Sequence, residues 1–258
     1  MKVATHQSAK SSDYNNESEG YDAFNEARSA VINFTTEQIL KKYHVKTVLD
    51  LTCGTGSQVF WLAQCGFTVT GSDINEKMLK IAKTKAKEEN LTLQFLKGDM
   101  RTAHIGEFDA VITIFNSIGH LTKADFKIAL RNIHRNLKKD GLYIFDIANL
   151  NYYLSSNHIT ELTVDWLTKA KDTNFRDIQY GTIDSDGILA LFNISIVQKD
   201  SEKPKISKST KTLQIYSASQ LKEILNKNGF TVLEQRGIDG SSFNQEHTDR
   251  ILTIAQKQ

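Results

Sequence analysis

Apolar and polar positions between residues 45 and 148 follow two alternating patterns. Short runs rich in Val, Ile, Leu and Phe are followed by segments whose apolar residues recur at the spacing of one helix face. The runs predict strands at 47–51, 67–73, 91–99, 108–117 and 142–148, and the segments between them predict helices near 57–65, 74–89 and 123–138. Because apolar strands that alternate with helices are typical of a parallel sheet covered on both faces, we expect an α/β fold.

The pattern differs on either side of this region. Residues 21–43 predict a helix, whereas the short alternating segments from about 150 to 215 predict antiparallel strands. The α/β pattern returns with a helix at 217–230 and strands at 230–236 and 249–257. The polar loop between the last two strands leaves no place for a crossover helix, so we expect those strands to pair antiparallel.

These patterns predict three parts. The fold class is a doubly wound, seven-stranded, mostly parallel sheet with an antiparallel final strand and an inserted antiparallel β cap. The core comprises residues 21–148 and 216–258, and the cap comprises residues 149–215. The polar residues 1–20 predict a mobile N-terminal tail.

Composition narrows the classes of protein. The chain has 258 residues with a formal net charge of +2, which gives no support for polyanion binding, so we expect no nucleic-acid partner. No apolar run approaches the roughly 20 residues of a membrane span, and the polar N-terminus has no signal-peptide core. We therefore expect a cytoplasmic protein with no membrane partner. Cys53 and Cys65, without a histidine cluster nearby, indicate neither a disulfide framework nor a metal site.

The turn after the first predicted strand gives the first chemical signal. Asp50 ends the strand, and Gly54 and Gly56 precede a helix, which brings backbone N–H groups beside a ligand. A dinucleotide fingerprint would have a third glycine where this chain has Val59, and a P-loop would need Gly-Lys-Ser/Thr. The carboxylate of Asp50 repels phosphates but suits a ligand with a positive centre.

Further acids follow the next two strands. Asp73 ends the second strand, where an acid typically binds both hydroxyl groups of a ribose. Asp99 ends the third strand beside Met100, and this pair suits the exocyclic amine and the ring of an adenine. S-adenosylmethionine has a ribose, an adenine and a cationic end without a polyphosphate, so we expect it as the cofactor.

Five motifs in register extend this interpretation over roughly residues 45–148. They are VLDLTCGTG, GSDINEKML, FLKGDMR, FDAVITIFNSIGHL and NIHRNLKKDGLYIFDI. In this region the chain resembles the class I S-adenosylmethionine-dependent methyltransferases, and GDMR with FDAVITIFNSIGHL is similar to small-molecule N-methyltransferases that act on amino sugars or glycine. The resemblance implies a Rossmann-like methyltransferase fold and methyl transfer to a small-molecule acceptor, an amine.

The resemblance also implies cofactor contacts residue by residue. Asp50 would orient the methionine amino group, Ile74 would lie against the adenine edge, and Arg28 would reach a carboxylate. Tyr14 and Tyr21 sit where related enzymes place an aromatic residue over the cofactor. All residues with an implied cofactor contact are Asp50, Gly54, Thr55, Gly56, Asp73, Ile74, Asp99, Met100, Phe115, Asn116, Ser117, Tyr14, Tyr21 and Arg28.

Three residues are candidates to assist the transfer itself. His120 follows the fourth strand, Asp146 lies near the end of the fifth, and Tyr21 could close over the methyl group. Methyl transfer is an in-line displacement for which the protein mainly supplies alignment, so a neutral amine needs no strong base. A hydroxyl group or a protonated amine would benefit from one.

Alternatives remain for the acceptor and for the activity. Methyltransferases that act on bases usually present Asn/Asp-Pro-Pro-aromatic after the fourth strand, whereas this chain reads FNSI at 115–118. That difference argues against base flipping, but a protein or RNA acceptor, a non-catalytic cofactor-binding module and an NAD-dependent oxidoreductase stay open. The cap at 149–215 is expected to line the acceptor pocket, and it could equally form a homodimer contact.

Overall fold

The computed structural model describes residues 5–12, 21–155, 162–170, 173–199 and 202–258. The helices are α1 (Tyr21–Lys42), α2 (Ser57–Gln64), α3 (Glu76–Glu88), the 3₁₀ helix η1 (Ser117–His120), α4 (Lys123–Arg135), α5 (Leu150–Ser155) and α6 (Ala218–Asn226). The strands are β1 (Thr47–Asp50), β2 (Thr68–Asp73), β3 (Gln94–Lys97), β4 (Phe108–Thr113), β5 (Leu137–Ala148), β6 (Leu162–Ala170), β7 (Thr173–Ile183), β8 (Ile188–Lys199), β9 (Lys205–Gln214), β10 (Phe230–Gly237) and β11 (Arg250–Lys257).

The core sheet has seven strands in the order β10-β11-β5-β4-β1-β2-β3. The pairs β1–β2, β1–β4, β2–β3 and β4–β5 are parallel, and β11 is antiparallel to both β5 and β10. The predicted doubly wound, mostly parallel sheet with an antiparallel final strand is confirmed. Because every strand except β11 runs in the same direction, their carboxyl ends meet at one edge, where ligands bind in such sheets.

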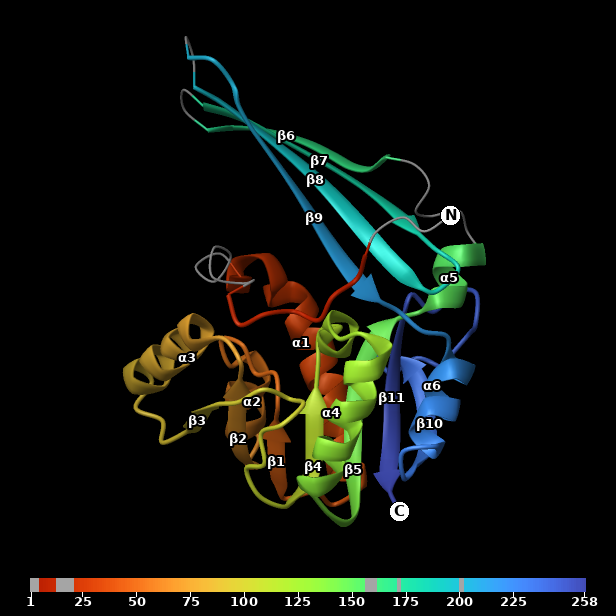
Figure 1. Cartoon of the computed structure of the whole chain (residues 1–258). Coiled ribbons are helices and arrows are strands. Elements are labelled where there is room, and N and C mark those ends of the chain that lie inside the picture. The colour runs from red at the N-terminus through yellow and green to blue at the C-terminus, as the bar shows by residue number, and fades with distance from the viewer. Residues whose placement is uncertain (1–4, 13–20, 156–161, 171–172, 200–201) are drawn as a thin grey trace.

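Helices cover both faces of the core sheet (Figure 1). Buried residues of α1, α2 and α3 form one apolar cluster with alternate strand residues such as Val48, and those of α4 and α6 form a second cluster with Leu49 and its counterparts. This strand alternation explains why the strands read as continuous apolar runs: both of their faces are buried. None of the described helices is long and apolar enough to cross a bilayer.

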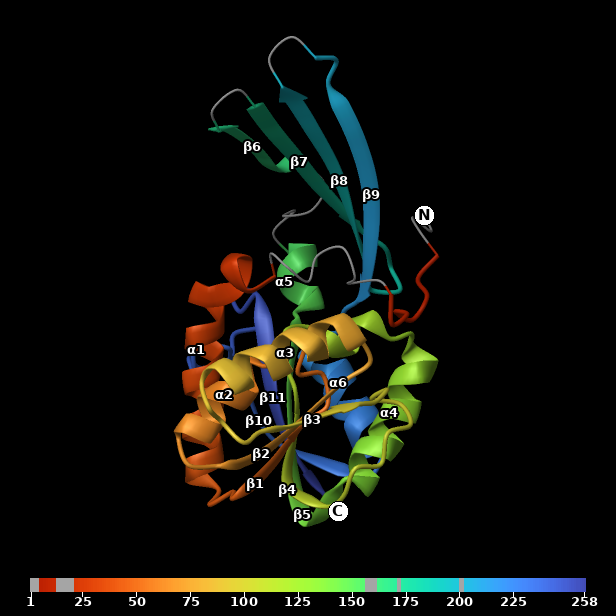
Figure 2. The same ribbon diagram turned by 90° about the vertical axis from the view of Figure 1, so that its left-hand side faces the viewer.

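The inserted cap is a second sheet of four antiparallel strands in the order β6-β7-β8-β9 (Figure 2). It projects from the carboxyl edge of the core sheet and is joined to it through α5 and a bridge between Asn149 and Tyr216. The predicted antiparallel cap is therefore confirmed.

Two strand boundaries differ from the prediction. β4 ends at Thr113 rather than at residue 117, because Phe115 and Asn116 have φ angles of 65° and 58° and leave the extended conformation. β5 begins at Leu137, earlier than residue 142, and continues through a polar stretch that contains Asp140 at a φ of 60°. Both departures occur where the backbone is left-handed, at Phe115 and Asn116 after β4 and at Asp140 within β5, and hydrophobic periodicity does not detect this conformation.

We expect Phe126→Ala to lower the free energy of unfolding by about 3–5 kcal/mol. Phe126 is fully buried in α4, with its ring centroid 6.2 Å from that of Phe145 and 5.6 Å from that of Tyr216. Urea unfolding measures the loss. Ile128→Ala is the control on the same helix, because Ile128 is 37% exposed and should lose less than about 1 kcal/mol. Equal losses in the two variants would contradict this account of the core.

Candidate functional site

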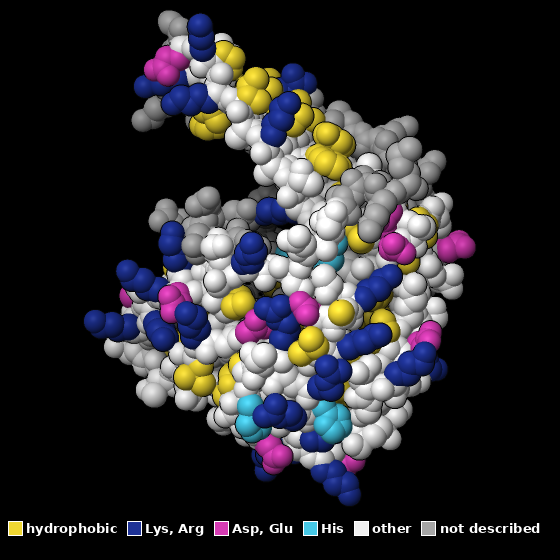
Figure 3. Space-filling view, in the orientation of Figure 1, with side chains coloured by type: hydrophobic (Ala, Val, Ile, Leu, Met, Phe, Trp, Pro, Cys, Tyr) yellow, Lys and Arg dark blue, Asp and Glu magenta, His cyan; other side chains and the backbone are white. Residues whose placement is uncertain are grey.

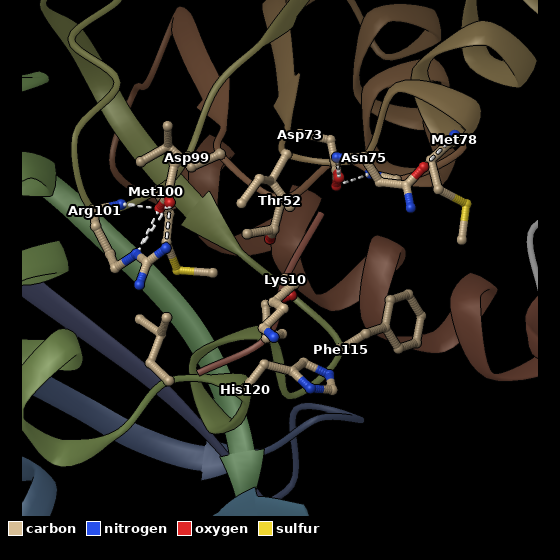
Figure 4. Close-up of a pocket in the computed structure, with 16 residues that line it drawn as sticks. Lys10, Thr52, Asp73, Asn75, Met78, Asp99, Met100, Arg101, Phe115 and His120 are labelled. Atoms are coloured by element: carbon tan, nitrogen blue, oxygen red, sulfur yellow. Dashed lines mark hydrogen bonds and ion pairs between the residues drawn. The ribbon is translucent and has the colours of Figure 1, made fainter. Parts of the chain in front are cut away.

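A cavity lies at the carboxyl edge of the core sheet, over the ends of β1, β2 and β4 (Figure 4). We call it the first cavity. Its described lining consists of Ala9, Lys10, Leu51, Thr52, Gly54, Asp73, Ile74, Asn75, Met78, Asp99, Met100, Arg101, Phe115, Ser117, His120 and Leu121. The predicted cofactor residues brought together in this lining are Gly54, Asp73, Ile74, Asp99, Met100, Phe115 and Ser117. The motifs that pointed to one ligand therefore do meet around one space.

The carboxylate of Asp50 lies at the end of β1, next to the cavity residue Thr52. Asp50 is only 1% exposed, and its Oδ1 accepts a hydrogen bond from the Thr52 backbone N–H at 3.1 Å. Among the described residues, its Oδ2 has no hydrogen-bond partner. Burial raises the pKa of Asp50 to about 8, and the nearby Asp73 carboxylate adds to the rise. A buried oxygen without a donor is unfavourable, so this position favours a cationic donor supplied by a ligand.

The glycine turn after β1 requires left-handed backbone. Gly54 has a φ of 52° and Gly56 a φ of 96°, and α2 begins directly after Gly56. A Cβ at residue 56 would lie 2.7 Å from the Phe60 ring, so a side chain there is excluded by space as well as by conformation. Thr55 between the glycines is buried, and Val59 packs into the core at the position of a third dinucleotide glycine.

Asp73 joins this turn to the end of β2. Its Oδ2 accepts a hydrogen bond from the Gly54 N–H and its Oδ1 one from the Asn75 N–H, both at 2.8 Å. Burial raises its pKa, which these backbone hydrogen bonds partly offset. The Asn75 side chain caps α3 by accepting from the N–H groups of Lys77 and Met78. Asp73 is therefore held rigidly against the first cavity rather than used as the helix cap.

Asp99 is shared between the first cavity and an ion pair. Its carboxylate accepts hydrogen bonds from Arg101 Nε at 3.0 Å and from the Arg101 backbone N–H at 2.8 Å. Burial alone would raise the pKa of Asp99, but these hydrogen bonds hold it below its usual value. Arg101 also binds Asp125 at 2.8 Å. An adenine contact of Asp99 stays a prediction, and any such contact shares the carboxylate with Arg101.

Residues 5–12 lie across the first cavity, although they fall in the predicted mobile tail. The Ala9 N–H donates to the carbonyl of His120 at 2.8 Å, and the Asn75 side chain donates to the carbonyl of Ser11 at 2.8 Å. Figure 4 shows the Lys10 side chain in the cavity, between Thr52 and His120. This part of the tail is thus bound to the core at several points.

Asp146 is fully buried at the end of β5 and lines neither the first cavity nor the second cavity described next. Its two oxygens accept hydrogen bonds from the backbone N–H groups of Phe115 and Asn116, and Arg250 pairs with it. The structure therefore does not present this carboxylate to a substrate, contrary to the expectation that it assists the transfer directly.

A second cavity lies on the other side of the Phe115–Asn116 corner. It is bounded by α5, the inner ends of β7–β9 and the loop that joins β10 to β11. Its described lining consists of Val31, Asn116, Ala148, Tyr152, Tyr153, Gln179, Gly181, Leu189, Leu191, Leu213, Gly237, Ile238, Asp239, Ser241, His247, Thr248, Asp249 and Arg250. The cap thus contributes to this cavity, as the sequence predicts for an acceptor pocket.

Three predicted residues are not placed. Tyr14 lies outside the described residues. Tyr21 and Arg28 lie in α1, but their side chains are also outside what the structure describes. Their predicted cofactor contacts, and the catalytic assistance predicted for Tyr21, stay predictions.

Comparisons with known proteins agree with this geometry. A family model described as a methyltransferase domain matches residues 48–141. YqeM of Bacillus subtilis (strain 168), named as a candidate methyltransferase, is 32% identical over 213 residues, which cover 81% of this chain and 83% of that protein. The chain belongs to the S-adenosylmethionine-dependent methyltransferases. Human glycine N-methyltransferase is 31% identical to this methyltransferase over 135 residues, which cover 46% of each chain.

Solved structures show the same fold. An S-adenosylmethionine-dependent methyltransferase from Clostridium acetobutylicum ATCC 824 has a TM-score of 0.76 at 19% identity and covers 95% of this chain and 98% of its own. The sugar N-methyltransferase KedS8 from Streptoalloteichus has a TM-score of 0.71 at 16% identity, with coverages of 98% and 97%. The predicted methyltransferase fold and S-adenosylmethionine as the cofactor are confirmed for this enzyme.

The prediction missed several residues of the methyltransferase that line the first cavity. The motifs contain a signal for three of them. Arg101 follows the predicted residue Met100, and Asn75 and Met78 come shortly after the predicted residue Ile74. Lys10 had no such signal, because it stands in a polar segment without periodicity that is held at the cavity by the bonds of Ala9 to His120 and of Ser11 to Asn75.

Asp50→Asn should abolish a proton release that accompanies cofactor binding. Because the pKa of Asp50 is raised to about 8, the cofactor-free enzyme carries Asp50 protonated at pH 6.5. A ligand ammonium group at Oδ2 favours the charged form, so binding of S-adenosylmethionine should release about one proton at that pH, and affinity should rise as the pH approaches 8. Calorimetry in buffers of different ionisation enthalpy measures the release. An unchanged release in the variant would contradict this role.

Proposed function

We propose that this enzyme transfers the methyl group of S-adenosylmethionine to the nitrogen of a small-molecule amine. The observation that carries the proposal is the pair of cavities on the two sides of the Phe115–Asn116 corner. The first is lined by the residues that suit the cofactor, and the second is lined in part by the cap. An in-line displacement needs two binding sites of this kind, with the reacting atoms held between them.

The residues of the first cavity fit the cofactor. Asp50 Oδ2 is buried without a donor among the described residues, and it would take the methionine ammonium group directly or through water. Asp73 would hold the ribose hydroxyls, and Met100 would pack on the adenine. When bound, S-adenosylmethionine supplies an electrophilic methyl group, and attack by an amine lone pair forms a C–N bond, breaks the C–S bond and leaves S-adenosylhomocysteine.

The second cavity supports an amine acceptor with a carbon skeleton. Tyr152, Leu189 and Leu191 supply apolar and aromatic contacts, and Asp239 and Asp249 are the acidic residues in its described lining. Its only described Lys or Arg, at position 250, is paired with a buried carboxylate and adds little positive potential. A neutral or cationic amine fits such a lining better than a phosphorylated acceptor does. The names of the glycine and sugar N-methyltransferases support the same class of acceptor.

Alignment supplies most of the rate acceleration. Orientation of two reactants contributes on the order of 7–11 kcal/mol, so a neutral amine needs no strong base. His120 lines the first cavity on η1, where it would assist the transfer from the cofactor side of the Phe115–Asn116 corner. The assistance expected of Tyr21 stays a prediction, because its side chain lies outside the described residues. The partners are therefore a small-molecule amine and no nucleic acid, in a cytoplasmic enzyme.

The enzyme assembles as a homodimer through the cap. Strand register places a row of apolar residues on one face of the cap sheet, and Leu167 and Ile206 on this face are 73% and 59% exposed. The apolar residues of this cap face are Leu167, Ile178, Tyr180, Phe192, Ile194, Ile196 and Ile206, and the same register places Arg176 and Lys208 among them. Figure 3 shows hydrophobic side chains along the projecting cap. A two-fold axis brings the same patch of two copies together and covers both.

Calorimetry and a product assay test the activity. We expect the enzyme to bind S-adenosylmethionine and to release S-adenosylhomocysteine with at least one member of a panel of amino acids, amino sugars and small amines. Matched hydroxyl compounds, a protein fraction and an RNA fraction form the remaining arms. Failure to bind the cofactor, or turnover only with one of those arms, would overturn the proposal.

His120→Ala should lower kcat about 10-fold or more while the Kd for S-adenosylmethionine changes less than about threefold. The reason is that His120 is proposed to assist the transfer, whereas the groups proposed to hold the cofactor are Asp50, Asp73 and Met100. Because His120 also lines the first cavity, both kcat and Kd are measured. His104→Ala is the control, because His104 is exposed in a loop outside the cavity lining. Unchanged turnover on the true acceptor, or a loss confined to cofactor affinity, would exclude the role.

Ile206→Glu should convert the dimer to a monomer, because it places a charge on the apolar cap face, where Ile206 is 59% exposed. Ser207→Glu is the control on the opposite face of the same strand. Sedimentation velocity over a range of concentrations measures the state of both variants. Two results would contradict the proposed homodimer: a parent protein that is already monomeric, or a Ser207→Glu variant that is monomeric while the Ile206→Glu variant stays dimeric.

A further inference from the structure

The corner that separates the two cavities has an unfavourable backbone. Phe115 and Asn116 are consecutive non-glycine residues with φ angles of 65° and 58°. Asparagine tolerates the left-handed region, but phenylalanine rarely adopts it. A backbone of this kind persists only where the surroundings hold it, and such sites cluster where a protein needs a fixed geometry.

The carboxylate of Asp146 holds this corner from the neighbouring strand. Its Oδ1 accepts the Phe115 N–H at 2.6 Å, and its Oδ2 accepts the Asn116 N–H at 3.2 Å. The parallel pairing of Thr113 with Phe145 places Asp146 directly beside the end of β4. One buried side chain thus binds the N–H groups of both strained residues.

Arg250 completes the arrangement from β11. Its Nε donates to Asp146 Oδ2 at 3.0 Å, its Nη2 donates to the same oxygen, and its side chain is only 11% exposed. The guanidinium carbon also lies 5.5 Å from the centre of the Phe115 ring. A buried carboxylate is stable only with such a partner, so Arg250 both neutralises Asp146 and contacts the residue that Asp146 holds.

The corner touches both binding sites. Phe115 lines the first cavity, and Asn116 lines the second cavity together with Arg250 and Ala148. The Asn116 side chain is itself fixed, because its Oδ1 accepts the Ala148 N–H at 2.8 Å. A shift of the corner would therefore move the walls of both cavities together.

We propose that the buried Asp146–Arg250 pair positions the methyl transfer by holding Phe115 and Asn116 in their left-handed conformation, so that it sets the separation of cofactor and acceptor. This inference rests on the proposed function for its catalytic consequence. Asp146 is then a positioning residue and not a general base, since both of its oxygens already accept backbone N–H groups.

Asp146→Asn tests the inference with a readout that needs no activity. The amide group can no longer accept from both backbone N–H groups, so hydrogen exchange at the amides of Phe115 and Asn116 should accelerate at least 10-fold. We expect kcat to fall about 10- to 100-fold, as for a misplacement near 1 Å, while the Kd for S-adenosylmethionine changes less than about threefold. The pH dependence of kcat/KM should keep its shape, because no catalytic base has been removed.

Asp109→Asn is the matched control. Asp109 also accepts backbone N–H groups, from Lys46 and Thr47, and pairs with a cation, Lys138, at 2.7 Å. It lies at the amino edge of the same sheet, away from both cavities. Its variant should keep kcat within about twofold.

Asn116→Gly provides the decisive background. Glycine adopts a positive φ without strain, so the corner then depends less on Asp146. Asp146→Asn should therefore lower kcat less in the Asn116→Gly enzyme than in the parent, and part of the loss should remain because Phe115 keeps its left-handed conformation. A double variant tests the ion pair separately. Arg250→Gln alone leaves the charge of Asp146 without its partner, and adding Asp146→Asn restores a neutral hydrogen-bonded pair. The double variant should therefore regain part of the kcat that Arg250→Gln loses.

Three outcomes would overturn the inference. They are unchanged exchange at both amides in Asp146→Asn, loss of a limb of the pH profile in that variant, and equal loss of kcat in the parent and Asn116→Gly backgrounds. Failure of the proposed function is distinguishable, because the parent protein would then bind no cofactor or methylate no amine, whereas the exchange measurement would still report on the corner.

Discussion

Buried carboxylates that accept backbone N–H groups organise the carboxyl edge of this sheet. Asp50 and Asp73 end strands, Asp146 lies near the end of β5, and each accepts from backbone of a loop beside it. A buried carboxyl group is stable as a charged carboxylate only if it has hydrogen-bond donors or a cation as partners, and otherwise it takes up a proton. The three differ accordingly: Asp146 has Arg250, Asp73 has several backbone donors, and Asp50 keeps an oxygen without a described partner. Oδ2 of Asp50 is therefore the carboxylate oxygen with which a cationic ligand would pair.

Much of the fold was predictable because periodicity reports burial. The strands of the parallel core are covered on both faces, so their apolar runs are continuous, whereas most residues of β8 and β9 are half-buried or exposed, so polar residues interrupt their apolar ones. The errors have one cause. Phe115 continues an apolar run and Lys138–Gly141 interrupts one, yet β4 ends before the first and β5 passes through the second. The backbone is left-handed at both places, at Phe115 and Asn116 and at Asp140, and side-chain hydrophobicity does not encode that conformation.

The candidate site divides in the same way. Gly54, Asp73 and Met100 were predictable because each stands at a fixed offset from a strand end, and strand ends converge in a parallel sheet. Lys10 and the pairing of Asp146 with Arg250 were not, because they depend on contacts between residues about a hundred positions apart. Asp146 had the right place in the sequence for a catalytic acid. Its burial and its hydrogen-bond donors, which the sequence does not reveal, are the basis of the positioning role proposed above.

The two cavities are formed by different kinds of segment. The first cavity is formed almost entirely by strand ends and by residues within a few positions of them, so the cofactor site follows from the core fold. The second combines α5, the cap and the loop before β11, segments that the core fold does not constrain. The Phe115–Asn116 corner contributes to both cavities. Its backbone N–H groups donate to Asp146 of β5, which pairs with Arg250 of β11, and both strands belong to the core. If the two cavities take cofactor and acceptor as proposed, acceptor specificity would change with the cap while the core strands keep the corner between the cavities in place.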